Sequence, residues 1–170
     1  MNTRFAHTTK SLLTGAALLA GSVGLSGCFY ICTCFVGEPL DSISQCGSAP
    51  TEIALACPDD LIAETGDTFA IAVSGDEDAV EDLRFKRDGD TLTVGREDGS
   101  NWNSGKATIT VTMPAPTDIS MFGSGTITAQ EMADDGDISM AGAGSIAVGQ
   151  VEVERLDMSS AGSGSGRAAG

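Results

Sequence analysis

The last third of this chain repeats itself, and the repeat constrains the fold more than any other feature of the sequence. Residues 119–127 (ISMFGSGTI) recur at 138–146 (ISMAGAGSI), and every matched position is shifted by 19 residues. A looser third copy occupies residues 156–165. A fixed period near 20, with short apolar runs and paired glycines, is typical of a β-solenoid, in which each coil buries its apolar edge against the next. The repeat therefore predicts a β-solenoid with rungs of about 19 residues.

In such a stack, the apolar side chains of successive copies lie above one another. We expect three columns: Ile119, Ile138 and Leu156; Met121, Met140 and Met158; and Ile127 with Ile146. The paired glycines fall where the backbone turns sharply or passes close to its neighbour. The segment 159–170 is also consistent with a flexible linker, because it is rich in Gly and Ser and has Gly166 where the earlier copies have Ile.

The rest of the mature domain also has the pattern of an all-β protein. Residues 107–113 alternate strictly between apolar side chains and Thr, are rich in β-branched residues and are followed by Pro114, which predicts a strand. Residues 68–74 predict another strand, and residues 82–94 predict two short strands around a turn at Asp88-Gly89. A helix near residues 76–82 would be barely two turns long. We therefore predict an all-β domain over residues 51–170.

The N-terminus has the features of an exported lipoprotein. A basic start and an uncharged apolar run precede Leu25-Ser26-Gly27-Cys28, which resembles the lipobox of bacterial lipoproteins. The run is short for a transmembrane helix. We therefore expect residues 1–27 to be a cleaved signal peptide, Cys28 to carry the lipid and residues 28–50 to form a Cys-rich tether. The alternative is an ordinary cleaved signal peptide with a Cys nearby. Phe29 after the lipid-bearing Cys fits sorting to the outer membrane.

The charge of the mature chain restricts its partners. The whole chain has a formal net charge of −15. Without residues 1–27, seven Lys and Arg face 24 Asp and Glu, which gives −17. Such an acidic surface repels nucleic acid and anionic lipid headgroups, so neither is an expected partner. Membrane attachment would come through the lipid on Cys28.

The remaining cysteines predict disulfides. Setting Cys28 aside leaves Cys32, Cys34, Cys46 and Cys57, an even number in an oxidising compartment. Two disulfides are expected, and three connectivities remain open. No paired C-x-x-C knuckles suggest zinc, so we predict no metal site.

No motif predicts catalysis. The only His lies in the signal peptide, so Ser124 between two glycines lacks the usual base of a serine nucleophile. Acidic clusters at residues 134–137, 76–78 and 88–90 would suit a glycosidase or a calcium site. Few aromatic residues are available to bind a sugar, and no calcium-loop motif matches. We interpret these carboxylates as solvated turn residues and predict no catalytic residue and no cofactor.

Several segments resemble one bacterial family. Residues 61–67, 69–71, 88–94 and 109–114, followed by the Gly-Ser-Gly turns, are similar to the head GIN domain. This domain of unknown function is labelled an auto-transporter adhesin, and the resemblance covers residues 53–170. It implies a right-handed, mostly parallel β-helix on secreted or lipid-anchored proteins. No functional residues are established for the family, so none are transferred. The Cys-rich tether and the end of the chain in mid-rung depart from the family pattern.

These observations predict a lipid-anchored protein of the bacterial cell envelope, working as a non-enzymatic adhesion or interaction module. Its partner would be a protein or glycan surface. Trp102, in the polar loop from Arg96 to Lys106, is the candidate contact residue. One alternative is a periplasm-facing structural protein that self-associates through its open end. A polysaccharide-active enzyme is a second, more distant alternative.

Overall fold

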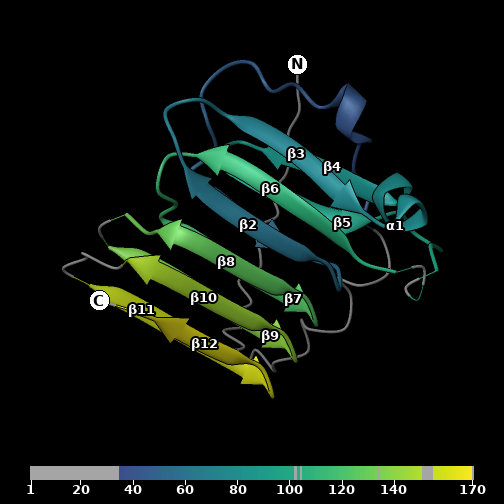
Figure 1. Ribbon diagram of the computed structural model, residues 1–170. Coiled ribbons are helices and arrows are strands. Elements are labelled where there is room, and N and C mark those ends of the chain that lie inside the picture. Colours follow the sequence, from purple (N-terminus) through teal and green to yellow (C-terminus); the bar gives the residue numbers. More distant parts are fainter. Residues whose placement is uncertain (1–34, 102, 104, 134, 151–154, 170) are drawn as a thin grey trace, which may run out of the picture.

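Two six-stranded sheets form the domain in the computed structural model, which describes residues 35–169 apart from 102, 104, 134 and 151–154. Sheet A has the order β11 (Leu156–Gly162), β9 (Gly136–Gly142), β7 (Asp118–Gly123), β1 (Glu52–Leu55), β5 (Thr91–Arg96) and β4 (Leu83–Asp88). Sheet B has the order β12 (Ser165–Ala168), β10 (Ser145–Gln150), β8 (Thr126–Glu131), β2 (Asp60–Thr65), β6 (Ala107–Met113) and β3 (Ala70–Gly75). Two short helices, η2 (Leu40–Ser42) and α1 (Glu77–Glu81), lie beside the β3 and β4 end (Figure 1).

The predicted right-handed parallel β-helix is wrong. Each sheet mixes parallel and antiparallel pairs: β4 is antiparallel to β5, and β3 is antiparallel to β6. The strand order also departs from the chain order, because β1 lies between β5 and β7 and β2 lies between β6 and β8. The Asp88-Gly89 turn favours a local hairpin, with Gly89 at a φ of +62°, and this pairing precludes a parallel coil there. The 19-residue repeat covers the last third of the chain and carries no information about this region.

Within the repeat, the first two copies stack as predicted and the third does not. Ile119 pairs with Ile138 and Ile127 pairs with Ile146. In the third copy Met158 pairs with Ile138, so the expected stacking of Leu156 on Ile138 and of Met158 on Met140 is wrong.

The register of the third copy is set by its glycines. Gly162 pairs with Gly142, 20 residues earlier, and both have a positive φ. A Cβ on Gly162 would lie 2.2 Å from the Gly142 carbonyl oxygen, so only glycine allows this close approach of two turns.

The hydrophobic core lies between the two sheets. Strand β6 follows a strict alternation, with Ala107, Ile109, Val111 and Met113 buried, which confirms the strand predicted at residues 107–113. The predicted pair of strands over 82–94 is confirmed by β4 and β5. The largest fully buried side chains are Ile53, Leu55, Leu61, Phe85, Leu92, Ile109, Met113, Ile119, Met121, Ile127, Ile138 and Ile146.

The two ends of the sheets differ. At the β3 and β4 end, a segment that we call the cap (residues 35–48) covers the outer edges. Glu38 and Phe85 exchange two backbone hydrogen bonds of 2.8 Å, and the Gln45 side chain accepts from the Ile71 N–H at 3.0 Å. At the other end, no strand within the described residues pairs with the outer edge of β11 or β12 (Figure 1).

Candidate functional site

A buried ion pair between Asp59 and Arg96 is the main polar feature of the interior. Both side chains have no exposed surface. Arg96 Nε donates to Asp59 Oδ2 at 2.9 Å, and Arg96 Nη2 donates to Asp59 Oδ1 at 2.6 Å. The Ala107 N–H adds a third donor to Asp59 Oδ1 at 2.9 Å. A bidentate pair with a further backbone donor satisfies both carboxylate oxygens in a place that water does not reach.

The electrostatics of this pair follow from its contacts. Burial alone would raise the pKa of the Asp59 carboxyl, but the hydrogen bonds from Arg96 and from the Ala107 N–H outweigh burial and hold that pKa below its usual value. The hydrogen bond with Asp59 in turn raises the pKa of Arg96. Asp59 therefore stays ionised in the folded protein across the neutral range.

The pair fastens the base of a polar loop, residues 97–106, which joins β5 to β6. Arg96 Nη2 donates to the Gly105 carbonyl at 2.8 Å. From the other side, Asp76 Oδ2 accepts from the Lys106 N–H at 2.9 Å, and Lys106 Nζ lies 3.2 Å from Asp60 Oδ1. The predicted contact residue, Trp102, belongs to this loop but lies outside the described residues.

We expected Arg96 to begin the polar loop, and the structure corrects this. Arg96 is the last residue of β5 and is buried. It follows Leu92 and Val94 at every second position, so it occupies the next inward-facing site of the strand. This alternation of inward-facing positions is the sequence signal that could have identified a buried arginine. Its partner Asp59 lies 37 residues away in the sequence, and no local pattern identifies such a pair.

Two of the four cysteines predicted to form disulfides lie within the described residues, so the two disulfides stay a prediction. Cys46 and Cys57 are both free thiols, Cys46 exposed and Cys57 buried. Burial, followed by the neighbouring Asp59 carboxylate, raises the pKa of the Cys57 thiol, so it stays protonated and unreactive. Cys28, Cys32 and Cys34 lie outside the described residues, and so does the predicted signal peptide.

The acidic clusters singled out from the sequence do not converge in the described part of the chain. There, no three His, Cys, Asp or Glu side chains are grouped closely enough to hold a metal ion. Asp76 binds the loop backbone, and Asp88 lies 3.7 Å from Lys86 on the surface. Asp134 is outside the described residues.

Among the described residues, no helix is both long and apolar enough to cross a membrane.

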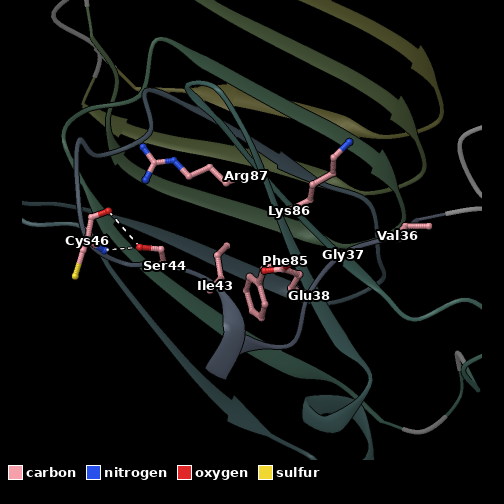
Figure 2. A pocket seen from close by; sticks show the side chains of 9 residues that line it. All are labelled: Val36, Gly37, Glu38, Ile43, Ser44, Cys46, Phe85, Lys86 and Arg87. Carbon is pink, nitrogen blue, oxygen red and sulfur yellow. Dashed lines mark hydrogen bonds between the residues drawn. The ribbon is translucent and has the colours of Figure 1, made fainter.

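A pocket of about 570 Å³ lies between the cap and β4 (Figure 2). Its lining combines apolar and basic groups: Val36, Gly37, Glu38, Ile43, Ser44, Cys46, Phe85, Lys86 and Arg87. In Figure 2 the Lys86 amino group and the Arg87 guanidinium extend away from each other. Arg87 is already engaged, because it donates to the Ser48 carbonyl and lies 5.5 Å from the centre of the Phe69 ring. Arg87 therefore links β4 to the cap.

The sequence model of a family described as "Putative auto-transporter adhesin, head GIN domain" matches residues 49–170. The chain belongs to this family. The resemblance noted over residues 53–170 is thereby confirmed. No curated protein sequence matches the chain.

Solved structures share the head GIN fold at low sequence identity. One, described as a "putative adhesin" from Bacteroides fragilis, has a TM-score of 0.60 at 19% identity, and the match covers 71% of this chain and 57% of that one. Another, described as a "Putative lipid binding protein" from Parabacteroides distasonis, has a TM-score of 0.50 at 20% identity over 71% and 62% of the two chains. At this identity the likeness shows the fold alone. The head GIN match begins at residue 49, so the cap precedes it.

Proposed function

We propose that this head GIN protein is a lipid-anchored, non-enzymatic adhesion module of the bacterial cell envelope. The family description and the name of one structural neighbour both support an adhesive role. The observation that carries the proposal is the fastening of loop 97–106 by the buried Asp59–Arg96 pair. Fixing the base of a loop reduces the conformational freedom that is lost on binding, which favours a recognition surface. Trp102 would provide its aromatic anchor.

The position of the cap supports the anchoring part of the proposal. Cys28 precedes Phe35, the first residue of the cap, by seven positions in the sequence. Val36 in the cap is 82% exposed, which is compatible with a membrane-facing surface. The outer edge of β11 lies five strand spacings from β4, roughly 24 Å. A lipid on Cys28 would thus hold the cap near the bilayer.

A second candidate function has its own supporting observation. Within the described residues, no strand pairs with the outer edges of β11 and β12, and such edges pair readily with other chains. This observation supports the alternative of a periplasm-facing envelope protein that self-associates.

The adhesion proposal is tested on cells that produce the full chain. We expect these cells to bind arrayed glycans or extracellular matrix proteins, and we expect Trp102→Ala to abolish the binding while surface levels stay unchanged. Asn103→Ala, at an exposed position of the same loop, is the matched control. Cys28→Ser should release the protein from the membrane fraction. Binding that survives Trp102→Ala would remove the loop from the account, and a protein that stays membrane-bound after Cys28→Ser would remove the anchor.

A further inference from the structure

Two sets of contacts hold the cap against β4 and so fix the walls of the pocket between them. Glu38 and Phe85 exchange two backbone hydrogen bonds of 2.8 Å, and a Cβ on Gly37 would lie 3.0 Å from the Phe85 nitrogen. Arg87 donates to the Ser48 carbonyl. The space of about 570 Å³ beside these contacts has the size of a small-molecule site, and contacts within the chain hold its walls.

The floor of this pocket is apolar. Ile43 of the cap and Phe85 of β4 both line it and belong to the hydrophobic core. Figure 2 shows these two side chains between Cys46 and Val36. Val36 extends the apolar lining and is 82% exposed. A hydrocarbon chain placed here would therefore remove apolar surface from water.

The charge of the pocket is opposite to that of the whole chain. The described lining has two cationic side chains, Lys86 and Arg87, and one anionic side chain, Glu38. The chain as a whole has 24 Asp and Glu against nine Lys and Arg. A negatively charged ligand is therefore attracted to this pocket, although the net charge of the molecule repels it.

Lys86 is the cation that is available to a ligand. Arg87 is held by Ser48 and lies over the Phe69 ring. The Lys86 side chain is 54% exposed, and its ion-pair partner among the described residues is Asp88, which is 3.7 Å away and 83% exposed. An exposed pair of this kind contributes little to stability, so Lys86 can exchange Asp88 for the carboxylate of a ligand. The flexible stem of a lysine lets its amino group follow such a carboxylate.

We infer that this pocket binds an unbranched fatty acid. The carboxylate would lie on the Lys86 amino group, and the hydrocarbon chain would lie along Ile43, Phe85 and Val36. A ligand with one charged end and one apolar end matches a pocket with one available cation and an apolar floor. Neither loop 97–106 nor a lipid on Cys28 takes part, so the inference goes beyond the proposed adhesion and does not depend on it.

Binding is tested by isothermal titration calorimetry with decanoate, below its micelle concentration, on the full chain carrying Cys28→Ser, so that no lipid is attached. We expect saturable one-to-one binding that weakens by about fourfold for each methylene removed from the ligand, because each buried methylene contributes a similar free energy. Decanol, which has the same chain without the charge, should bind about tenfold more weakly. No saturable binding of decanoate, or equal binding of decanol, would overturn the proposal.

Matched variants test the position of the ligand. Lys86→Ala should weaken the binding of decanoate about tenfold. Arg167→Ala, which removes one positive charge from an exposed position on β12, should leave binding unchanged. Ser44→Trp places a large ring at an exposed position of the lining and should abolish binding, whereas Ser42→Trp, at an exposed position outside the described lining, should not.

Circular dichroism would verify that all four variants fold. An equal loss of binding in Lys86→Ala and Arg167→Ala would show that decanoate responds only to net charge and would overturn the proposal. Binding that survives Ser44→Trp would place the ligand elsewhere and would overturn it as well.

Discussion

The two ends of the sheets differ in whether their edge strands are covered. At one end, the cap pairs with β4 and binds β3, and the underlying side chains are buried. At the other end, β11 and β12 have no outer partner within the described residues, and Met158 is 45% exposed. Both ends consist of edge strands, which pair readily with other chains. The difference indicates that the chain itself protects one edge, whereas within the described residues no strand covers the other.

The largest expected effect on stability concerns one apolar side chain from each end of the sheets. Phe85 on β4 is 1% exposed, so Phe85→Ala should lower the free energy of unfolding by about 3–5 kcal/mol. Met158→Ala, at a half-exposed site, should lower it by less than about 1 kcal/mol. Urea denaturation of the monomer measures both values. Equal losses would show that the open end is as tightly packed as the capped one.

The next comparison concerns two adjacent carboxylates. Asp59→Ala leaves Arg96 buried without its partner and should cost about 3–5 kcal/mol. Asp60 forms a half-exposed pair with Lys106 at 3.2 Å, so Asp60→Ala should cost about 1 kcal/mol or less. The same denaturation experiment measures both variants. A small loss of stability in Asp59→Ala would contradict the role of Asp59 in fastening loop 97–106.

These comparisons also show what could be predicted from the sequence. The strand at residues 107–113 and the hairpin around Asp88-Gly89 depend on alternation and a local turn, and both were predicted. The insertion of β1 between β5 and β7 depends on contacts between distant segments, and no local pattern encodes it. The third repeat follows the close approach of Gly162 to Gly142, which outweighs the apolar match that the prediction used.

The candidate site, too, could be predicted only where its sequence signal is local. Loop 97–106 was identified by its polar composition, but the side chains that fasten it were missed. Arg96 is a charged residue at an inward-facing strand position, and Asp59 is a buried charged residue just before β2, where an apolar side chain is the usual expectation. Their pairing satisfies both charges, but it becomes visible only when β5 and the segment before β2 are placed together.

A smaller effect separates two equivalent glycines of the repeat. A Cβ on Gly142 would lie 2.0 Å from the Gly123 carbonyl oxygen, and a Cβ on Gly162 would lie 2.2 Å from that of Gly142. Both have a positive φ, so Gly142→Ala should cost about 1–3 kcal/mol. Gly162→Ala should cost less, because β11 is an edge strand that can move outward. Thermal unfolding measures the two variants. A greater loss at Gly162 would contradict the looser packing of the open end.

The smallest expected effect is the dependence of stability on pH. The pKa of Asp59 is lower in the folded chain than in the unfolded chain, where it is about 3.9. Its contribution to stability is therefore complete above that value and is lost as the pH falls through the folded pKa. Asp59→Asn should reduce the loss of stability on acidification, measured by denaturation between about pH 5 and pH 2. Asp60→Asn is the control, and an identical change in both variants would argue against the buried pair as the cause.

The most direct test of the account is proteinase K digestion of intact cells that produce the full chain, with lysed cells as the control. The account predicts that the domain is digested on intact cells, because it would be held at the outer surface with its cap toward the membrane. Protection until lysis would contradict an adhesion module and would leave the periplasm-facing, self-associating protein as the remaining candidate.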